Sequence, residues 1–138
     1  MKAINKSQIV YTDGSCTPTN PGPGGWAFVL LDYDKYEREY HVSGGENYST
    51  NNRMELQAVI SALEFCNNTA DFSIYSDSMY VINCAQKKWK RKKNIDMWIE
   101  YDKFSKGKNI VWVKVKAHNG DKYNEIVDIL AKQEARNK

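Results

Sequence analysis

Two aspartates in this sequence occupy matching settings. Asp13 follows the apolar run Ile9 to Thr12, Asp77 comes just after the run Phe72 to Tyr75, and each is followed by a small residue. Such runs predict strands, and open α/β sheets bind ligands at the carboxyl ends of their strands. If the two strands are neighbours, both carboxylates project into one crevice and repel each other unless a cation lies between them. The pair therefore indicates a metal site, although a strand-end aspartate taken alone commonly starts a turn or caps a helix.

Glu55 is a third carboxylate, and it departs from the pattern around it. It belongs to a predicted helix that Thr50 or Asn51 can cap. At about 100° per residue, Glu55 lies within about 40° of Val59 and Ala62 on the apolar side of that helix. A carboxylate facing inward must be paired, hydrogen-bonded, protonated or metal-bound. The alternative is a cap partner in the first turn, which the helix dipole also favours.

A basic stretch forms a second candidate site. Residues 87–93 contain six cations around one aromatic residue, Trp89. Clustered cations bind polyanions by displacing condensed counterions, which indicates a phosphate-binding patch. The alternative is a solvated helix end and loop, as most charge runs prove to be.

Alternating strands and helices must position these residues. We predict strands at 9–12, 26–32, 36–42, 72–75 and 110–115, with irregular connections at 18–25 and 43–48. Helices are predicted from the cap at residue 50 or 51 to about 66, from the cap at Ser78 toward 88, and at 95–104 and 124–136. The order βββαβααβα predicts an α/β fold whose mixed five-stranded sheet begins antiparallel and ends with parallel crossovers.

Composition limits the class of protein. The chain has 138 residues, of which 41% are hydrophobic and 27% charged, typical of one globular domain spanning 1–138 rather than a disordered or membrane protein. The N-terminus lacks the apolar region of a signal peptide, and the three cysteines show neither disulfide nor zinc-site spacing. A cytoplasmic, reducing location is expected.

Five segments, in order, resemble the signature segments of the type 1 ribonucleases H, and the likeness runs from about residue 8 to 135. The segments are Tyr11–Cys16, Asn20–Gly25, Thr50–Leu56, Ser76–Ser78 with Tyr80, and Lys116–His118 followed by Asn124 and Asp128. The resemblance implies the ribonuclease H-like fold and an endonuclease that hydrolyses the RNA strand of RNA·DNA hybrids, leaving 5′-phosphate and 3′-hydroxyl ends. A monomer without an obligate protein partner is expected.

The resemblance also implies a ligand set. Asp13, Glu55, Asp77 and Asp128 would bind two Mg²⁺ ions, for which Mn²⁺ can substitute; the helical periodicity alone does not single out Asp128. His118 would assist proton transfer or product release, a role that a neutral imidazole near pH 7 suits. Without the resemblance, His118 reads as an ordinary surface histidine.

Substrate contacts follow from the shape of the hybrid. The resemblance implies that Asn20, Asn51 and Asn52 contact RNA 2′-hydroxyls in the shallow minor groove, and that Thr50 and Asn94 form a pocket for a DNA-strand phosphate. Turn formation and helix capping also explain several of these residues. Longer bacterial members insert a basic handle that in this chain is largely missing or reduced to a charged loop, so we expect the basic stretch at 87–93 to hold the DNA strand instead. The residues assigned to that contact are Lys87, Lys88, Trp89, Lys90 and Arg91.

Two other functions remain open from the sequence. One is a binding module that keeps the fold without catalysis, but such a module has no need of all four carboxylates. The other is a nuclease or strand-transfer enzyme acting on DNA, because related folds use similar carboxylates. A smaller departure from the family pattern is Met79, where a polar substrate-contacting residue is usual.

Overall fold

The computed structural model describes residues 7–32, 38–66, 69, 71–116 and 120–138. The elements, in chain order, are β1 (Ser7–Cys16), β2 (Gly22–Asp32), β3 (Arg38–Ser49), α1 (Asn51–Phe65), β4 (Asp71–Ser76), α2 (Met79–Ala85), α3 (Ile95–Ser105), β5 (Asn109–Lys114) and α4 (Lys122–Arg136). The predicted order βββαβααβα is confirmed.

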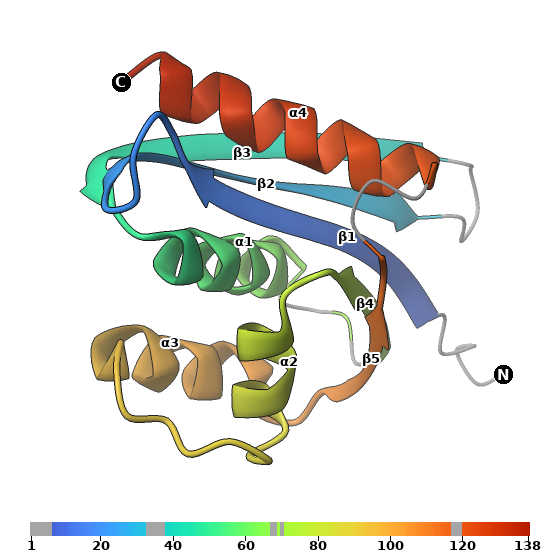
Figure 1. Ribbon diagram of the computed structural model, residues 1–138. Helices are drawn as coiled ribbons and strands as arrows, with labels where there is room; N and C mark the ends of the chain where they lie inside the picture. The colour runs from blue at the N-terminus through green and yellow to red at the C-terminus, as the bar shows by residue number, and fades with distance from the viewer. Residues whose placement is uncertain (1–6, 33–37, 67–68, 70, 117–119) are drawn as a thin grey trace, which may run out of the picture.

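One five-stranded sheet organises the molecule, with the strand order β3-β2-β1-β4-β5. The strands β1, β2 and β3 pair antiparallel, whereas β1–β4 and β4–β5 pair parallel. Figure 1 shows α4 across one face of the sheet and α1 against the other, with α2 and α3 beyond α1. The predicted mixed sheet is therefore confirmed, and β1 and β4 are neighbours.

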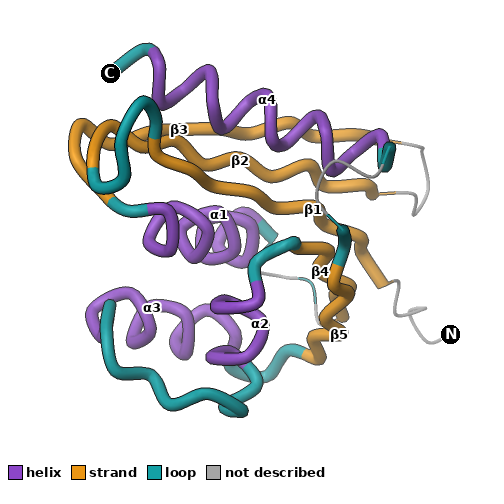
Figure 2. The backbone as a smooth tube through the Cα atoms, viewed as in Figure 1, coloured by secondary structure: helices purple, strands orange, loops and turns teal. Residues whose placement is uncertain are grey.

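The alternation of side chains along the strands builds a separate core on each face. On the α1 side, Val10 and Phe28 belong to the larger apolar cluster, which also contains Trp98 of α3. On the α4 side, Tyr11 and Val29 pack with Val127. Successive strand residues point to opposite faces, so a one-residue shift in register would exchange the two cores. The layers are traced in Figure 2.

The strands β2 and β3 are longer than predicted. Residues 22–25 and 43–48 were expected to be irregular, but they continue the β2–β3 ladder, with a register shift between Gly22 and Gly24. Glycines weaken a strand unless another backbone approaches closely. That is the case at Gly25, where an added Cβ would collide with the Ala131 carbonyl oxygen of α4. Gly25 therefore lets α4 lie on the sheet.

The helix α2 is shorter than predicted, because it ends at Ala85 rather than near 88. Lys87 has a positive φ of 60°, and the amide of Lys88 donates to the Asn83 carbonyl while that of Lys87 donates to Cys84. This is the Schellman pattern that closes a helix. Within the described residues, none of the helices is long and apolar enough to cross a membrane.

Candidate active site

The sheet itself brings Asp13 and Asp77 together. The parallel pairing of β1 with β4 reaches Tyr11 opposite Tyr75, and each aspartate lies two residues beyond that last pair. The sequence predicted that the strand ends just before Asp13, and this is wrong, because β1 continues beside β2 to Cys16. Instead β4 ends at Ser76, which leaves the β4 side of Asp13 unpaired. The crevice expected at two neighbouring strand ends forms where β4 leaves the sheet.

Glu55 reaches this crevice from α1. The Thr50 hydroxyl caps the helix by accepting from the Arg53 amide at 3.2 Å, as predicted. The first turn of α1 then lies directly on β1, since an added Cβ at Gly14 would meet the backbone of Met54 and Glu55. Only a glycine permits this approach, and it places the Glu55 carboxylate beside Asp13.

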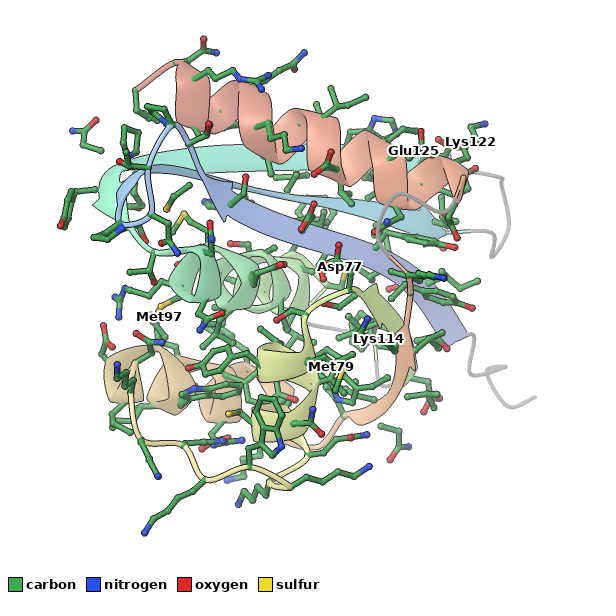
Figure 3. All side chains as sticks on the ribbon, in the orientation of Figure 1. Asp77, Met79, Met97, Lys114, Lys122 and Glu125 are labelled. Carbon is green, nitrogen blue, oxygen red and sulfur yellow. The ribbon has the colours of Figure 1, made fainter. Side chains whose placement is uncertain are left out.

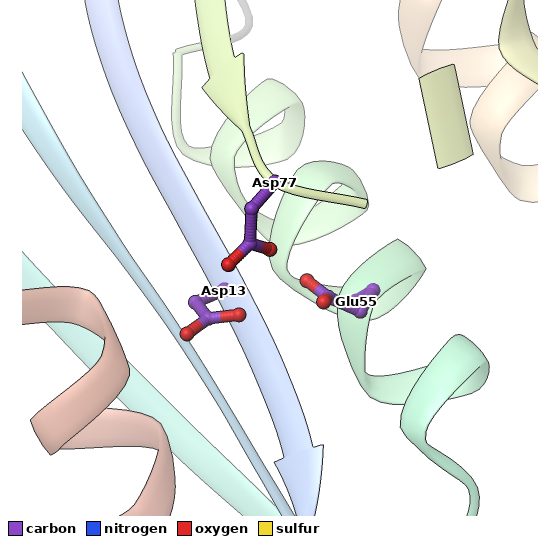
Figure 4. A group of neighbouring side chains, drawn as sticks. All are labelled: Asp13, Glu55 and Asp77. Carbon is purple, nitrogen blue, oxygen red and sulfur yellow. The ribbon is translucent and has the colours of Figure 1, made fainter. Parts of the chain in front are cut away.

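Asp13, Glu55 and Asp77 form one acidic group, in which ligand oxygens from all three lie within 4.8 Å of one another. Figure 4 shows the three carboxylates converging from β1, α1 and the residue that follows β4. Asp13 is only 5% exposed, and its Oδ1 accepts from the Gly14 amide at 2.9 Å. Among the residues that the structure describes, the buried Glu55 Oε1 atom has no hydrogen-bond partner. An unpaired buried carboxylate oxygen in such a group fits a hard divalent cation such as Mg²⁺.

The raised pKa values of the three carboxyl groups agree with that fit. Burial and the neighbouring Asp77 raise the pKa of Asp13 to about 8. Burial, followed by the charges of Asp13 and Asp77, raises the pKa of Glu55 well above its ordinary value. Burial also raises the pKa of Asp77, although the positive charge of Lys114 opposes this shift. Without a cation, the group therefore retains protons that free carboxyls would release.

Asp128 is not part of the three-carboxylate group. It lies on α4 close enough for its charge to raise the pKa of both Asp13 and Asp77. Its Oδ2, however, accepts from the Lys132 ammonium at 3.2 Å, one helical turn further along. The fourth carboxylate is thus paired with a lysine of its own helix. The i,i+4 spacing of the two residues on a predicted helix permits this pair, although spacing alone does not show that it forms.

The asparagines meet at the rim next to this group. The Asn20 Oδ1 accepts from the backbone amide of Asn51 at 3.0 Å, and the Asn51 Oδ1 accepts from the amide of Cys16 at 2.7 Å. Their amide oxygens therefore fasten the loop before β2 to the first turn of α1 and to the end of β1. Asn52 is exposed beside them. Their contacts with an RNA strand stay a prediction.

Arg53 connects the two residues assigned to a phosphate pocket. Its amide donates to the Thr50 hydroxyl, and its guanidinium donates to Asn94 at 3.1 Å and to both Asp96 carboxylate oxygens at 3.1 and 2.9 Å. Asn94 in turn donates to the Tyr80 hydroxyl at 2.9 Å. Arg53 was not among the site residues nominated from the sequence. Its position three residues after a capping Thr50 predicts only that its amide donates to the Thr50 hydroxyl, not where its guanidinium lies.

The basic stretch divides into two kinds of residue. Lys87, Lys88, Trp89 and Lys90 are exposed, Trp89 to 47%. Arg91 instead turns inward, with a side chain 14% exposed that donates to the Cys84 carbonyl, pairs with Asp102 and stacks over Trp98 at 4.4 Å. Its guanidinium is occupied in fixing the loop to α2 and α3. The DNA-strand contact stays a prediction, and the geometry favours the exposed residues for it. His118 lies outside the described residues.

Comparison with known proteins decides the family. The sequence model of the RNase H family matches residues 5–136. This chain belongs to the ribonuclease H family. The Ribonuclease H of Ehrlichia ruminantium is 45% identical over 97% of this chain and 98% of the relative, and the Ribonuclease HI of Helicobacter pylori strain J99 is 44% identical over 92% of each. The expected resemblance is confirmed.

A solved structure of LC11-RNase H1 in complex with an RNA/DNA hybrid has the same fold. It matches this chain with a TM-score of 0.79 at 24% identity, over 95% of this chain and 98% of that one. The ribonuclease H-like fold expected from the sequence is therefore confirmed. As a ribonuclease H, the protein is an enzyme, a nuclease of the hydrolase class.

Proposed function

We propose that this ribonuclease H is an endonuclease that cuts the RNA strand of RNA·DNA hybrids with two divalent metal ions, leaving 5′-phosphate and 3′-hydroxyl ends. The observation that carries the proposal is the convergence of ligand oxygens of Asp13, Glu55 and Asp77 within 4.8 Å, where the buried Glu55 Oε1 has no hydrogen-bond partner in the described part of the chain. Hybrid specificity draws support from the asparagine rim and from the fold shared with a hybrid-bound ribonuclease H.

In the proposed site, Asp13, Glu55, Asp77 and Asp128 hold the ions, Mg²⁺ by preference and Mn²⁺ as a substitute. Oxygen-only ligands suit both cations. When bound, the ions supply a nucleophile at neutral pH and stabilise the charge on the leaving oxygen. Because the Asp128 Oδ2 pairs with the Lys132 ammonium at 3.2 Å, Lys132 would compete with the ions for this fourth ligand.

Other residues of the chain bind and orient the substrate. Asn20, Asn51 and Asn52 would contact RNA 2′-hydroxyls beside the cut, because short polar side chains reach them in a shallow minor groove. Thr50 and Asn94 would bind a DNA-strand phosphate, with the Arg53 guanidinium adding charge between them. His118 would move a proton or speed product release.

The DNA strand would extend to the exposed part of the basic stretch, where Lys87, Lys88 and Lys90 attract phosphates and Trp89 offers an aromatic surface. We further propose that one domain, residues 1–138, acts as a monomer in the cytoplasm. The free thiols of Cys16, Cys66 and Cys84 are compatible with a reducing compartment.

The proposed function is tested by offering a labelled RNA·DNA hybrid, duplex RNA and duplex DNA side by side, with Mg²⁺ and with EDTA. We expect metal-dependent cutting of the RNA in the hybrid alone, lost in Asp13→Asn. A folded wild type that binds the hybrid without cutting it would instead indicate a binding module. Preferential cutting of duplex DNA would indicate the DNA-nuclease alternative. Sequencing the product ends tests the predicted 5′-phosphate.

A further inference from the structure

Lys114 is a cation at the rim of the acidic group that the residues assigned so far do not include. It is the last residue of β5, and β5 pairs parallel with β4 so that Lys114 lies opposite Ser76, the residue before Asp77. Figure 3 shows Lys114 on β5 and Asp77 beyond the end of the neighbouring strand. Adjacent strands lie about 4.8 Å apart, so the lysine is one strand away from the acidic group.

The Lys114 ammonium is available to a ligand. The residue is exposed, and its Nζ donates to the Val115 carbonyl at 3.1 Å. An ammonium has three donors, so this bond leaves two. Within the described part of the chain, no carboxylate forms an ion pair with Lys114. Its charge nevertheless acts on the site, since it lowers the pKa of Asp77 against the effect of burial.

The neighbouring side chains create a need for such a group. Asp13, Glu55 and Asp77 together present negative charge to an incoming phosphodiester, and like charges repel it. Met79, two residues after Asp77, is 52% exposed, but its thioether has no donor for a phosphate oxygen. Lys114 supplies both a donor and a positive charge on the β5 side of the group, and a charge-assisted hydrogen bond to phosphate is among the stronger polar contacts.

We propose that Lys114 binds a phosphate of the RNA strand adjacent to the one that is cut, and so holds that strand across the three carboxylates. This inference rests on the proposed cutting of RNA·DNA hybrids. It makes Lys114 a substrate-contacting residue on β5, at the side of the acidic group opposite the asparagine rim that joins β1 to α1.

Lys114→Gln and Lys114→Arg test the proposal, with Lys106→Gln as a matched control at an exposed position after α3. The dissociation constant of the hybrid is measured in EDTA, where it is not cut, over a series of KCl concentrations. Cleavage in Mg²⁺ gives kcat and KM. For Lys114→Gln we expect hybrid affinity to fall about three- to tenfold. The slope of log affinity against log salt should become shallower by about 0.9, the value for one lost phosphate contact.

Lys114→Arg should retain most of the affinity and the full salt slope, and Lys106→Gln should resemble the wild type. An unchanged salt slope in Lys114→Gln, beside a wild type that cuts the hybrid, would overturn this inference alone. The inference would also be overturned if the only effect of Lys114→Gln were a lower Mg²⁺ affinity of the free protein, measured by calorimetry. That result would assign Lys114 to the metal site. A wild type that does not cut hybrids would overturn the proposed function and this inference with it.

Discussion

Replacing Asp13 by asparagine should stabilise the metal-free protein at neutral pH while abolishing cleavage. The folded state raises the pKa of Asp13 from 3.8 to about 8, chiefly by burial. Between these values the folded protein retains a proton that the unfolded chain releases. The stabilising contribution is therefore complete below about pH 4 and is lost as the pH rises toward 8. An amide does not titrate, so the variant lacks this loss.

The expected magnitude follows from the linkage. One retained proton changes the free energy of unfolding by about 1.4 kcal/mol per pH unit, so Asp13 by itself should lower the stability of the wild type by about 3 kcal/mol between pH 5 and 7. For a chain of this size, that corresponds to a fall in Tm of roughly 10 °C. Asp13→Asn should show a much shallower decline, and it also removes one of the charges that raise the pKa of Glu55.

The assay is thermal unfolding in EDTA from pH 5 to about pH 8.5, followed by circular dichroism. Glu64→Gln is the matched control, because it removes an exposed carboxylate from the same helix that carries Glu55. Added Mg²⁺ should restore wild-type stability increasingly as the pH rises, since the ion replaces bound protons, and should affect Asp13→Asn far less. Parallel pH profiles of wild type and Asp13→Asn would refute the reasoning.

Three further predictions concern the supports of the site. Lys132→Gln should raise the Mg²⁺ affinity of the free protein about twofold by calorimetry, because an exposed competing ion pair is worth about 0.3–0.5 kcal/mol; weaker Mg²⁺ binding would contradict this role. Gly14→Ala should lower the free energy of unfolding, measured in urea, by about 1–3 kcal/mol, because the added methyl group pushes α1 off β1. The kcat of the folded variant should also fall, and a stable variant with a normal kcat would refute the close contact. Arg91→Gln should lower the free energy of unfolding by about 1–2 kcal/mol, because its bonds to Cys84 and Asp102 are lost. In a binding titration it should weaken hybrid binding less than Lys88→Gln does, and a larger loss of affinity in Arg91→Gln would indicate that Arg91 contacts the DNA.

Local sequence signals were sufficient for much of this fold. The apolar periods and the capping residues Thr50 and Ser78 predicted the element order and the starts of α1 and α2, because both depend on contacts within a few residues. The continuation of β2 and β3 through their glycines could not be predicted in this way. Glycine disfavours a strand locally, and at Gly25 the compensating contact is with the backbone of α4, more than a hundred residues later.

The site shows the same division. Asp13, Glu55 and Asp77 could be nominated from their positions in individual elements, and their meeting followed once β1 and β4 were neighbours. The ion pair of Asp128 with Lys132 and the inward turn of Arg91 depend on which of several rotamers the long side chains adopt in the folded protein. Sequence spacing permits those contacts but does not select them.

The contact of α1 with β1 at Gly14 gives the catalytic spacing an unusual robustness. Where a helix rests on a strand through interlocking side chains, each substitution in that layer changes the separation of the two elements. Here the separation of α1 and β1 is set by contact between the main chain of Gly14 and that of Met54 and Glu55. A substitution of a neighbouring side chain does not change the size of these main-chain atoms. Substitutions elsewhere in the core are therefore free to drift in volume, lowering or raising the melting temperature, while the gap between Asp13 and Glu55 stays the same.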